Sequence, residues 1–359
     1  MNQKVLSRRG VAGVALAAIT AIALAACGSG QPSTTPQGSA ATGIEGASGE
    51  LKGSGASFPN AFYQEIVAEL QGKAKNLKVT YNSVGSSTGK KEFAQGLVDF
   101  AGSDSLVKDS DGIAKDSFYY LPTVAAPITV SYNLQGVDKL QLSAATVAKI
   151  FQRDIKTWND PAIAADNPGV TLPATAITVA HRTDGSGTTA NFTKYLTVAA
   201  KDTWKLGTGD TVEWSADTQG GAKNTGVAQI VTQVNGAIGY VDLSDATTLK
   251  LKFAAIKNKD GKFVLPTLEG TTAGLNGAKV NDDLSYDPLD ASGADAYPIT
   301  APTFLLVKRK YDDPKKAELV KAFVKYMLTD GQALAKEVHF APLPDSLKQK
   351  ALAQLDKVS

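Results

Sequence analysis

The chain has 359 residues, of which 43% are hydrophobic and 20% are charged, and these proportions are ordinary for a globular protein. The first 26 residues contain three basic residues and no acidic one, and without them 34 Lys and Arg stand against 35 Asp and Glu. This balance leaves no basic surplus for nucleic acid, and the length predicts two domains or one large one.

Residues 1–26 are predicted to be a signal peptide. Their basic residues precede an uncharged apolar run over 11–26, which is too short to span a membrane and suits the hydrophobic part of a signal sequence. The run ends in Leu-Ala-Ala before Cys27, which resembles a bacterial lipobox and implies cleavage before Cys27 and a lipid on its sulfur. The alternative is an ordinary signal peptide or anchor with a cysteine nearby by chance. Arg8 and Arg9 weakly resemble a twin-arginine signal, which leaves the secretion route open.

Residues 27–49 are rich in Gly, Ser, Thr, Pro and Ala, and this composition predicts a flexible tether. Because Cys27 is the only cysteine, no disulfide can form within the chain. The fold, expected to begin near Leu51, must therefore depend on its hydrophobic core.

Serine stands at the start of three predicted helices. Ser57 precedes a run in which Phe62, Ile66 and Leu70 recur every four residues, and Ser86 precedes a second helical run. Any one of these serines is readily explained as a structural N-cap. Their recurrence beside glycines also fits a set of helix starts that converge on an anion, because helix N-termini favour negative charge.

The third such stretch, residues 181–189, joins a β-branched run at 177–180 to a helical run. The first turn of a helix leaves backbone N–H groups without partners and carries partial positive charge, and Ser186 or Thr188 can cap it. Arg182 adds a planar fork of donors suited to a tetrahedral oxyanion. The stretch therefore predicts an anion-binding site.

Strands and helices alternate along the rest of the chain, which indicates an α/β fold. Strands are expected at 78–81, 98–104, 125–132, 236–241 and 299–307. Helices are expected at 143–151, 224–234, 313–327, 330–338 and 344–355. The remaining expectations are a hairpin around 259–261, irregular polar chain at 204–221 and an acidic, loop-rich stretch at 270–297.

The sequence shows no recognisable catalytic machinery. His181 and His339 are the only histidines, so no zinc motif can be built, and both are expected to be structural, although His181 can add positive potential beside the arginine. Ser186 is not in a nucleophile elbow, because Asp184 stands where glycine is needed. The stretch 185–189 lacks the lysine of a P-loop. We predict no catalytic residue, no metal and no cofactor.

Four motifs in order, at 55–59 (GASFP), 84–87 (VGSS), 98–104 (VDFAGSD) and 182–188 (RTDGSGT), together resemble the phosphate-binding proteins of Pst-type ABC importers. The resemblance extends from about Leu51 to the C-terminus. It implies an α/β, two-lobed periplasmic-binding-protein fold of type II, with a mixed sheet flanked by helices in each lobe.

The resemblance also implies how the chain divides between the lobes. Two hinge crossings are expected, near 127–133 and near 297–300. Lobe I then comprises residues 50–130 and 299–359, and lobe II comprises residues 131–298.

The same resemblance implies a phosphate site made by both lobes. Its expected ligands in lobe I are Ser57, Phe58, Ser86 and Asp104, and those in lobe II are Arg182, Ser186, Gly187 and Thr188. Asp184 resembles the family's acid that orients the arginine. Ser57 stands where many members have Thr, which keeps the hydroxyl, and the role of His181, often Arg in relatives, stays open.

Asp104 is the residue expected to select phosphate. Phosphate keeps a proton at neutral pH and sulfate does not, so a buried carboxylate accepts a hydrogen bond from the first anion and repels the second. An unsatisfied or repulsive group usually gives stronger specificity than an added contact.

Together these inferences predict a receptor that binds inorganic phosphate with high affinity by hinge closure and delivers it to the permease and ATPase subunits of an ABC importer. The lipobox predicts a receptor held by lipid at the outer face of the cell membrane, in a bacterium of Gram-positive type, and the receptor is expected to be monomeric. The alternatives are a receptor for sulfate or molybdate, a phosphate-ester hydrolase on the same scaffold, and a surface sensor or adhesin. The sequence predicts neither the affinity nor the residues that face the permease.

Overall fold

The structure is a computed structural model, and it describes residues 43–359. The predicted signal peptide, Cys27 and most of the predicted tether lie outside the described residues. Ile44 is fully buried and β1 begins at Gly49, so the packed chain starts several residues before Leu51. None of the helices within 43–359 combines the length and apolar character that crossing a bilayer requires.

One mixed sheet of ten strands has the order β2-β1-β3-β12-β4-β8-β6-β7, with β13 and β9 also paired to β4. Its strands are β1 (Gly49–Gly55), β2 (Leu77–Ser83), β3 (Phe100–Ser103), β4 (Phe118–Tyr132), β6 (Thr178–Arg182), β7 (Gln219–Gly221), β8 (Ala237–Asp242), β9 (Lys252–Phe253), β12 (Thr300–Lys308) and β13 (Ala341–Pro342). A small second sheet contains β5 (Gln141–Leu142), β10 (Ala255–Lys257) and β11 (Phe263–Val264). The predicted α/β class is confirmed.

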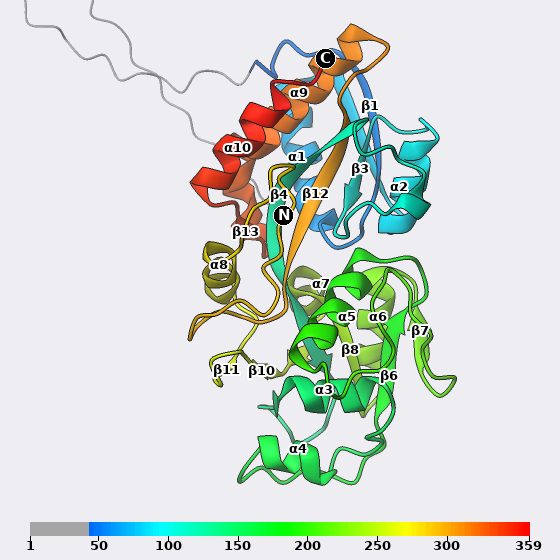
Figure 1. Cartoon of the computed structure of the whole chain (residues 1–359), viewed down its shortest axis with the longest axis vertical. Helices are drawn as coiled ribbons and strands as arrows, with labels where there is room; N and C mark the ends of the chain where they lie inside the picture. Colours follow the sequence, from blue (N-terminus) through cyan, green and yellow to red (C-terminus); the bar gives the residue numbers. More distant parts are fainter. Residues whose placement is uncertain (1–42) are drawn as a thin grey trace, which may run out of the picture. The chain divides into compact units, whose positions relative to one another are not determined.

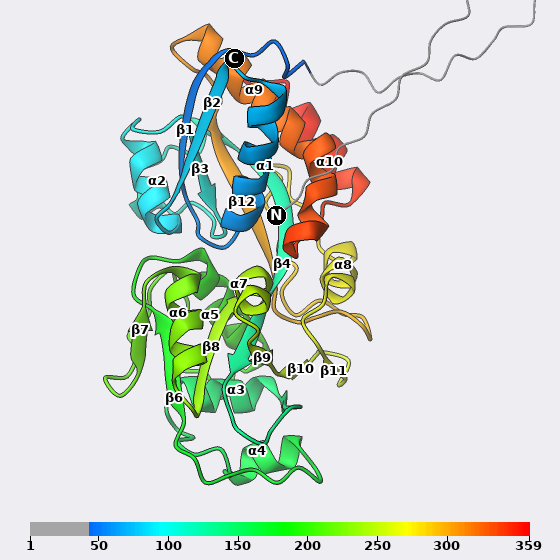
Figure 2. The ribbon, with the colours of Figure 1, turned by 180° about the vertical axis from the view of Figure 1, so that it is seen from behind.

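The helices occur between the strands along the chain. They are α1 (Asn60–Lys73), α2 (Ser86–Ala94), α3 (Ala144–Phe151), α4 (Pro161–Asp166), α5 (Gly187–Ala199), α6 (Lys223–Gln233), α7 (Leu243–Thr248), α8 (Leu268–Asn276), α9 (Pro314–Leu328) and α10 (Asp345–Leu355), with 3-10 helices η1 (Asp109–Asp111) and η2 (Asp330–Val338). Figures 1 and 2 show α1, α9 and α10 on one side of β1, β3 and β12, and α2 on the other.

Strand β4 belongs to two groups of strands. Its residues 118–127 pair with β12, and its residues 128–132 pair with β8. We call β1, β2, β3, β12, β13 and the first part of β4 the first strand group. The second part of β4 with β6, β7, β8 and β9 is the second strand group. The chain therefore passes between the groups within one continuous strand.

The chain returns to the first strand group just before β12, and this return passage is hydrogen-bonded to β4 at the point where β4 changes partners. Ile128 donates its N–H to the carbonyl of Ile299 at 2.8 Å, and the Tyr297 hydroxyl donates to the carbonyl of Ile128 at 2.9 Å. The two segments predicted as hinge crossings, 127–133 and 297–300, thus lie side by side.

Strand β4 begins earlier than the expected 125. The register between β4 and β12 shifts at Thr303/Phe304, so that Pro122 and Val124 have partners and Thr123 does not. A bulge tolerates a proline, which has no N–H to offer a ladder. The strand therefore continues through Pro122, a residue that weakens the sequence signal for a strand.

Helix α9 forms where the sequence predicts it. Asp313 caps the helix by accepting from the N–H of Lys315 at 2.9 Å, and Pro314 occupies the first turn. Val320, Phe323 and Met327 lie on one face and are buried at the core.

Helix α8 corrects the expectation of a loop over 270–297. Its sequence contains two glycines, which weaken a helix. Both are close to the return passage, because a Cβ on Gly270 would lie 3.2 Å from Cβ of Tyr297 and one on Gly274 would lie 3.1 Å from the Thr300 hydroxyl. The helix contacts β4, β12 and β13, so part of the segment assigned to lobe II packs on the first strand group. The lobe boundary at 298 stays a prediction.

Gly55, Gly89 and Gly102 let the backbones of β1, α2 and β3 pack against one another, close to where the chain leads into the predicted site. Gly55 ends β1 with a φ of +138°, and a Cβ there would overlap the carbonyl oxygen of Gly102 on β3. A Cβ on Gly89 of α2 would in turn overlap the Cα of Gly55. Backbone packs on backbone here, which only glycine permits.

Replacing Gly55 by alanine is expected to destabilise the protein by about 2–5 kcal/mol, because it adds an unfavourable φ to an overlap with backbone. The measurement is the free energy of unfolding in urea. Gly72→Ala is the control, since that glycine lies in α1 with open space around it and should gain stability slightly. Equal stability of the two variants would contradict the argument.

Candidate functional site

Arg182 ends β6 with its side chain almost completely buried and held by one carboxylate. Its Nε donates to Oδ1 of Asp184 at 2.8 Å, and its Nη2 donates to the other oxygen. Asp184 also accepts from the N–H of Lys223 at 2.9 Å. Burial acts to raise the pKa of Asp184, but the hydrogen bonds and charge of Arg182 outweigh it and hold the pKa below its ordinary value. Asp184 therefore holds the guanidinium through two hydrogen bonds.

The start of α5 lies directly after this pair. Ser186 is its N-cap and accepts from the N–H of Thr189 at 3.2 Å. At Gly187 the backbone of α5 lies close to Asp104 and Ser86, because a Cβ there would lie 2.7 Å from both Cβ of Asp104 and Oγ of Ser86. The glycine therefore lets the helix N-terminus face the other half of the predicted site.

Ser57 and Phe58 lie in the turn between β1 and α1, and both are buried. Neither donates its backbone N–H to an acceptor within residues 43–359. Two buried, neighbouring N–H groups at a helix start are suited to an anion.

Ser86 connects the two strand groups. Its hydroxyl oxygen accepts from the N–H of Gly187 at 3.1 Å and from the N–H of Asp104 at 3.4 Å. The structure thus brings the predicted residues of both lobes together. Ser86 contacts Gly187 and Asp104, and Arg182 contacts Thr188 at 3.4 Å, whereas Ser57 is linked to Thr188 by way of Asn224.

Asp104 follows β3 and is only 3% exposed. One of its oxygens accepts from the hydroxyl of Thr303 at 2.7 Å, and Asn191 donates to its backbone carbonyl at 2.6 Å. Burial raises the pKa of Asp104 to about 7, against the lowering effect of Thr303 and of the Arg182 charge. The site therefore contains a carboxyl group that exchanges its proton near neutral pH.

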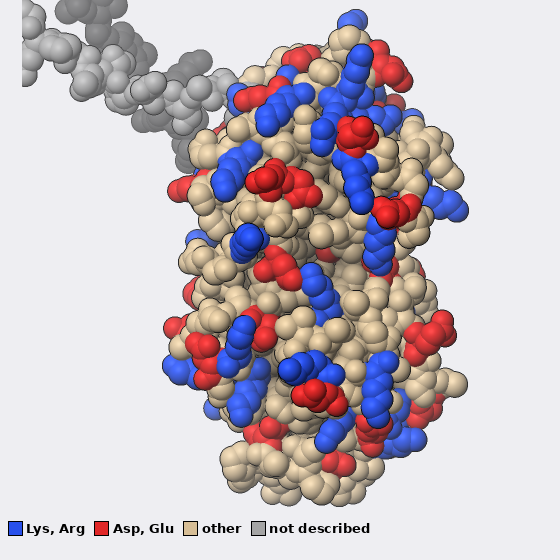
Figure 3. Space-filling view, in the orientation of Figure 1, with Lys and Arg blue, Asp and Glu red and all other residues tan. Residues whose placement is uncertain are grey.

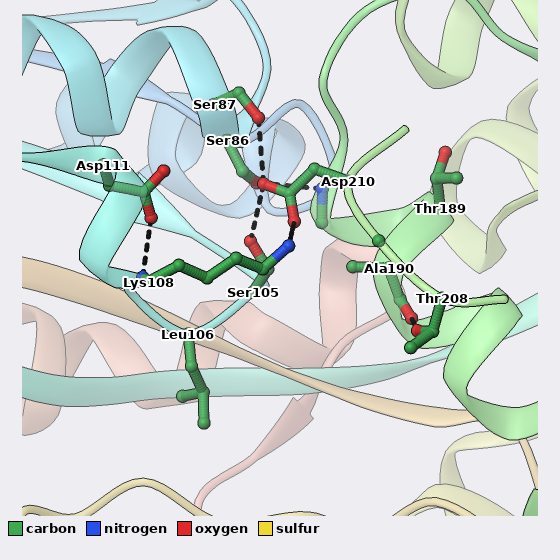
Figure 4. A network of polar contacts seen from close by, with 12 residues as sticks. Ser86, Ser87, Ser105, Leu106, Lys108, Asp111, Thr189, Ala190, Thr208 and Asp210 are labelled. Carbon is green, nitrogen blue, oxygen red and sulfur yellow. Dashed lines mark hydrogen bonds and ion pairs between the residues drawn. The ribbon is translucent and has the colours of Figure 1, made fainter. Parts of the chain in front are cut away.

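A second carboxylate, Asp210, joins the strand groups beside the site (Figure 4). It lies between α5 and β7, and it accepts from the hydroxyls of Ser87 at 2.9 Å and Ser105 at 3.1 Å. It also pairs with Lys90 at 3.1 Å and with Lys108 at 3.5 Å. All four partners come from the part of the chain that packs with the first strand group.

Lys90 is the buried cation of this network. Its side chain is 0% exposed and pairs with Asp111 at 2.9 Å as well as with Asp210. Burial acts to raise the pKa of Asp210, but the charges of Lys90 and Lys108 and the hydrogen bonds lower it overall. Asp210 is therefore held as a carboxylate, unlike Asp104.

Sequence reasoning missed four polar residues around the site, namely Lys90, Asp210, Asn224 and Thr303. Lys90 had one usable signal, because it lies three residues before Phe93 on the buried face of the predicted helix. Asp210 lies in a stretch without periodicity, and Thr303 lies in an apolar strand. Neither position had a signal that points to the site.

Two cavities reach the site. The first, of about 480 Å³, is lined by Asp104, Lys108 and Phe304 on one side and by Asn191 and Asp210 on the other. The second, of about 210 Å³, is lined by Ser57, Phe58, Lys223, Asp242 and Asp245 among others. On the face shown in Figure 3, acidic and basic side chains are interspersed, so no large patch of one sign covers that face.

His181 has a structural role. Its ring stacks on Trp214 with centroids 5.1 Å apart, and its Nδ1 lies 3.0 Å from the carbonyl of Arg182. Burial lowers the pKa of His181 from its ordinary value, which disfavours the charged ring and the positive potential considered from the sequence. Within residues 43–359, no three His, Cys, Asp or Glu side chains are grouped so as to hold a metal ion.

Comparisons with known proteins identify the family of the chain. Residues 35–331 match the family model described as a PBP superfamily domain. The chain is 35% identical over 320 residues to the phosphate-binding protein PstS of Xylella fastidiosa strain Temecula1, which covers 88% of this chain and 86% of the relative.

Two solved structures share the fold. A high affinity periplasmic phosphate-binding protein bound with phosphate (PfluDING) superposes with a TM-score of 0.71 at 20% identity, covering 85% of this chain and 93% of its own. A putative phosphate ABC transporter substrate-binding protein from Clostridium perfringens, also with bound phosphate, gives a TM-score of 0.61 at 17% identity, covering 82% of this chain and 100% of its own. The predicted two-lobed fold class is confirmed.

Ligand-free Asp104→Asn is expected to be more stable than the unchanged protein at pH 8 by about 2–4 kcal/mol, with little difference at pH 4. The folded-state pKa of Asp104 is raised from 3.8 to about 7, so the stability that this group contributes at low pH is lost as the pH rises through 7. Asparagine does not ionise and avoids that loss.

The measurement is urea unfolding in buffer free of phosphate at both pH values. Asp116→Asn makes the same change at an exposed aspartate and should leave stability unchanged. If Asp104→Asn and the unchanged protein were equally stable at pH 8, the raised pKa of Asp104 would be wrong.

Proposed function

Because the chain belongs to the PBP superfamily and, within it, to the PstS phosphate-binding proteins, we propose that it binds inorganic phosphate outside the cytoplasm and delivers it to an ABC permease. The ligand is supported by the PstS relative, a phosphate-binding protein, and by the phosphate bound in both solved structures. The transporter is supported by the Clostridium perfringens protein, which is described as the substrate-binding protein of a phosphate ABC transporter.

The observation that carries the proposal is the buried carboxyl group of Asp104, which lies among hydrogen-bond donors. Arg182, the start of α5 and the turn before α1 supply positive charge and N–H groups that would suit any tetrahedral anion. Asp104 adds an acceptor, and only an anion that still carries a proton can donate to it. Inorganic phosphate does so at neutral pH, whereas sulfate is repelled.

The eight residues named from the sequence are proposed as the phosphate ligands, with Asp184 in support of Arg182. Their convergence from both strand groups supports this assignment. The two strand groups, with their helices, are proposed as lobes that close around the anion by bending at the paired segments 127–133 and 297–300.

The protein is proposed to be a receptor and not a phosphate-ester hydrolase. The relatives are phosphate-binding proteins, which supports a binding role. We expect the protein to release no chromogenic leaving group from a phosphate ester.

The cellular setting is part of the same proposal. Cys27, at the end of a lipobox-like sequence, is proposed to carry a lipid that holds a monomeric receptor at the outer face of the membrane of a Gram-positive bacterium. The composition of residues 27–42 supports a tether that lets the folded part reach its permease.

In calorimetry at pH 8, phosphate is expected to bind the unchanged protein and sulfate to compete poorly. Asp104→Asn should allow sulfate to compete, because the neutral amide removes the repulsion and can donate a hydrogen bond. Asp99→Asn, the same change at the other end of β3, is the control and should retain the preference. If sulfate still failed to compete in the Asp104→Asn variant, this account of selectivity would be wrong.

Arg182→Ala is expected to weaken phosphate binding by roughly 2–5 kcal/mol, the range for removing one member of a buried charge pair. Arg182→Lys should lose less, because it keeps the charge but not the planar fork. Arg153→Ala removes an ion pair with Asp217 elsewhere in the second strand group and should bind phosphate normally. Unchanged affinity in Arg182→Ala, measured by calorimetry, would remove Arg182 from the site.

A further inference from the structure

Asn224, the second residue of α6, is completely buried between two of the proposed phosphate ligands. Its backbone N–H lies 3.4 Å from the hydroxyl oxygen of Ser57, and its side-chain Nδ2 lies 3.5 Å from the same oxygen. Nδ2 also lies 3.3 Å from the hydroxyl oxygen of Thr188. Asn224 therefore contacts one ligand from each strand group.

The neighbours of these two hydroxyls are all donors. Ser57 faces the two nitrogens of Asn224, and Thr188 faces Nδ2 of Asn224 and Nη1 of Arg182 at 3.4 Å. An amide N–H and a guanidinium have no lone pair to offer, so neither hydroxyl can donate its proton to them. The contacts are long and individually weak, but they agree in direction.

A hydroxyl that receives protons on both lone pairs must direct its own proton elsewhere. For Ser57 and Thr188 the remaining direction is the space between the strand groups, where the proposed anion binds. A hydroxyl free to rotate would instead present lone pairs to the anion for part of the time, which is repulsive.

The start of α6, which carries Asn224, is held by the carboxylate that holds the arginine. Asp184, which fixes Arg182, also accepts from the N–H of Lys223, the residue before Asn224. Lys223 has a φ of +62°, in the left-handed region, and this turn starts α6 at the site. The position of Asn224 is therefore coupled to that of Arg182 through Asp184.

One feature of Asn224 argues against a purely structural role. Its carbonyl Oδ1 is buried and has no hydrogen-bond partner within residues 43–359. A buried acceptor without a partner lowers stability, and such groups in native proteins tend to have a functional explanation. An apolar residue would fill this position without that loss.

We propose that Asn224 is a positioning residue for anion binding, which makes the hydroxyls of Ser57 and Thr188 donors toward the bound anion. This inference rests on the proposed function, because it takes phosphate as the ligand. It adds a residue whose amide acts through the two hydroxyls and not by its own contact with phosphate.

The first test is calorimetry with inorganic phosphate at pH 8. Asn224→Ala is expected to bind about tenfold to a hundredfold more weakly than the unchanged protein. Gln229→Ala removes an exposed amide from the same helix and should bind normally. If the unchanged protein did not bind phosphate, the proposed function would fail. If it bound and Asn224→Ala bound equally well, only the role of Asn224 would fail.

The second test separates positioning from structure by a double-mutant cycle with Ser57→Ala. If Asn224 acts through the hydroxyls, the loss of phosphate affinity caused by Asn224→Ala should be at least threefold smaller in the Ser57→Ala background, which has no hydroxyl at position 57 to orient. A structural effect would give the same loss in both backgrounds, and that result would overturn the inference.

The third test uses Asn224→Asp, which preserves the shape of the side chain. Its carboxylate would accept the protons of both hydroxyls, so binding should fall by about a hundredfold or more at pH 8. Relative to the unchanged protein at the same pH, the loss should shrink when the pH is lowered far enough to protonate this carboxyl group, which can then donate again. A loss independent of pH would contradict the role of Asn224 as a donor.

Discussion

A charge buried at this site needs a partner, and the partners of each carboxyl group determine the direction in which its pKa shifts. Arg182 is met by both oxygens of Asp184, and Lys90 is met by Asp111 and Asp210. Asp184 and Asp210, next to cations, have lowered pKa values, whereas Asp104, whose direct partner is a neutral hydroxyl, has a raised one. Asp184, Asp210 and Asp104 thus divide into two fixed charges and one exchangeable proton, a division that suits a protonated anion.

The backbone places these groups through a few close approaches. One strand, β4, pairs with both strand groups, so the halves of the site are linked by a continuous strand. Gly55 and Gly102 bring the ends of β1 and β3 into contact, and the segments that follow them carry Ser57 and Asp104. The polar groups therefore meet because backbones without side chains pack together some residues earlier.

The sequence predicted what depends on local pattern. The apolar spacing of α1, the Asp-Pro start of α9 and the junction of strand, turn and helix at Arg182 each report burial or capping within a few residues. The family resemblance, carried by four motifs, supplied the fold and the candidate ligands. Contacts such as Lys90 with Asp210, 120 residues apart, have no local pattern. Helix α8 was missed because its glycines oppose helix formation, and tertiary packing against the return passage overrides that preference.

The network around Asp210 has a consequence for the lifetime of a complex. In a receptor whose halves separate to release their cargo, the bonds from Asp210 to Ser87, Ser105 and Lys90 must break before the cargo leaves. None of these four residues is among the groups proposed to recognise the anion. Retention time and choice of cargo thus depend on different side chains, so evolution can slow or speed the unloading step while the preference for one anion stays the same.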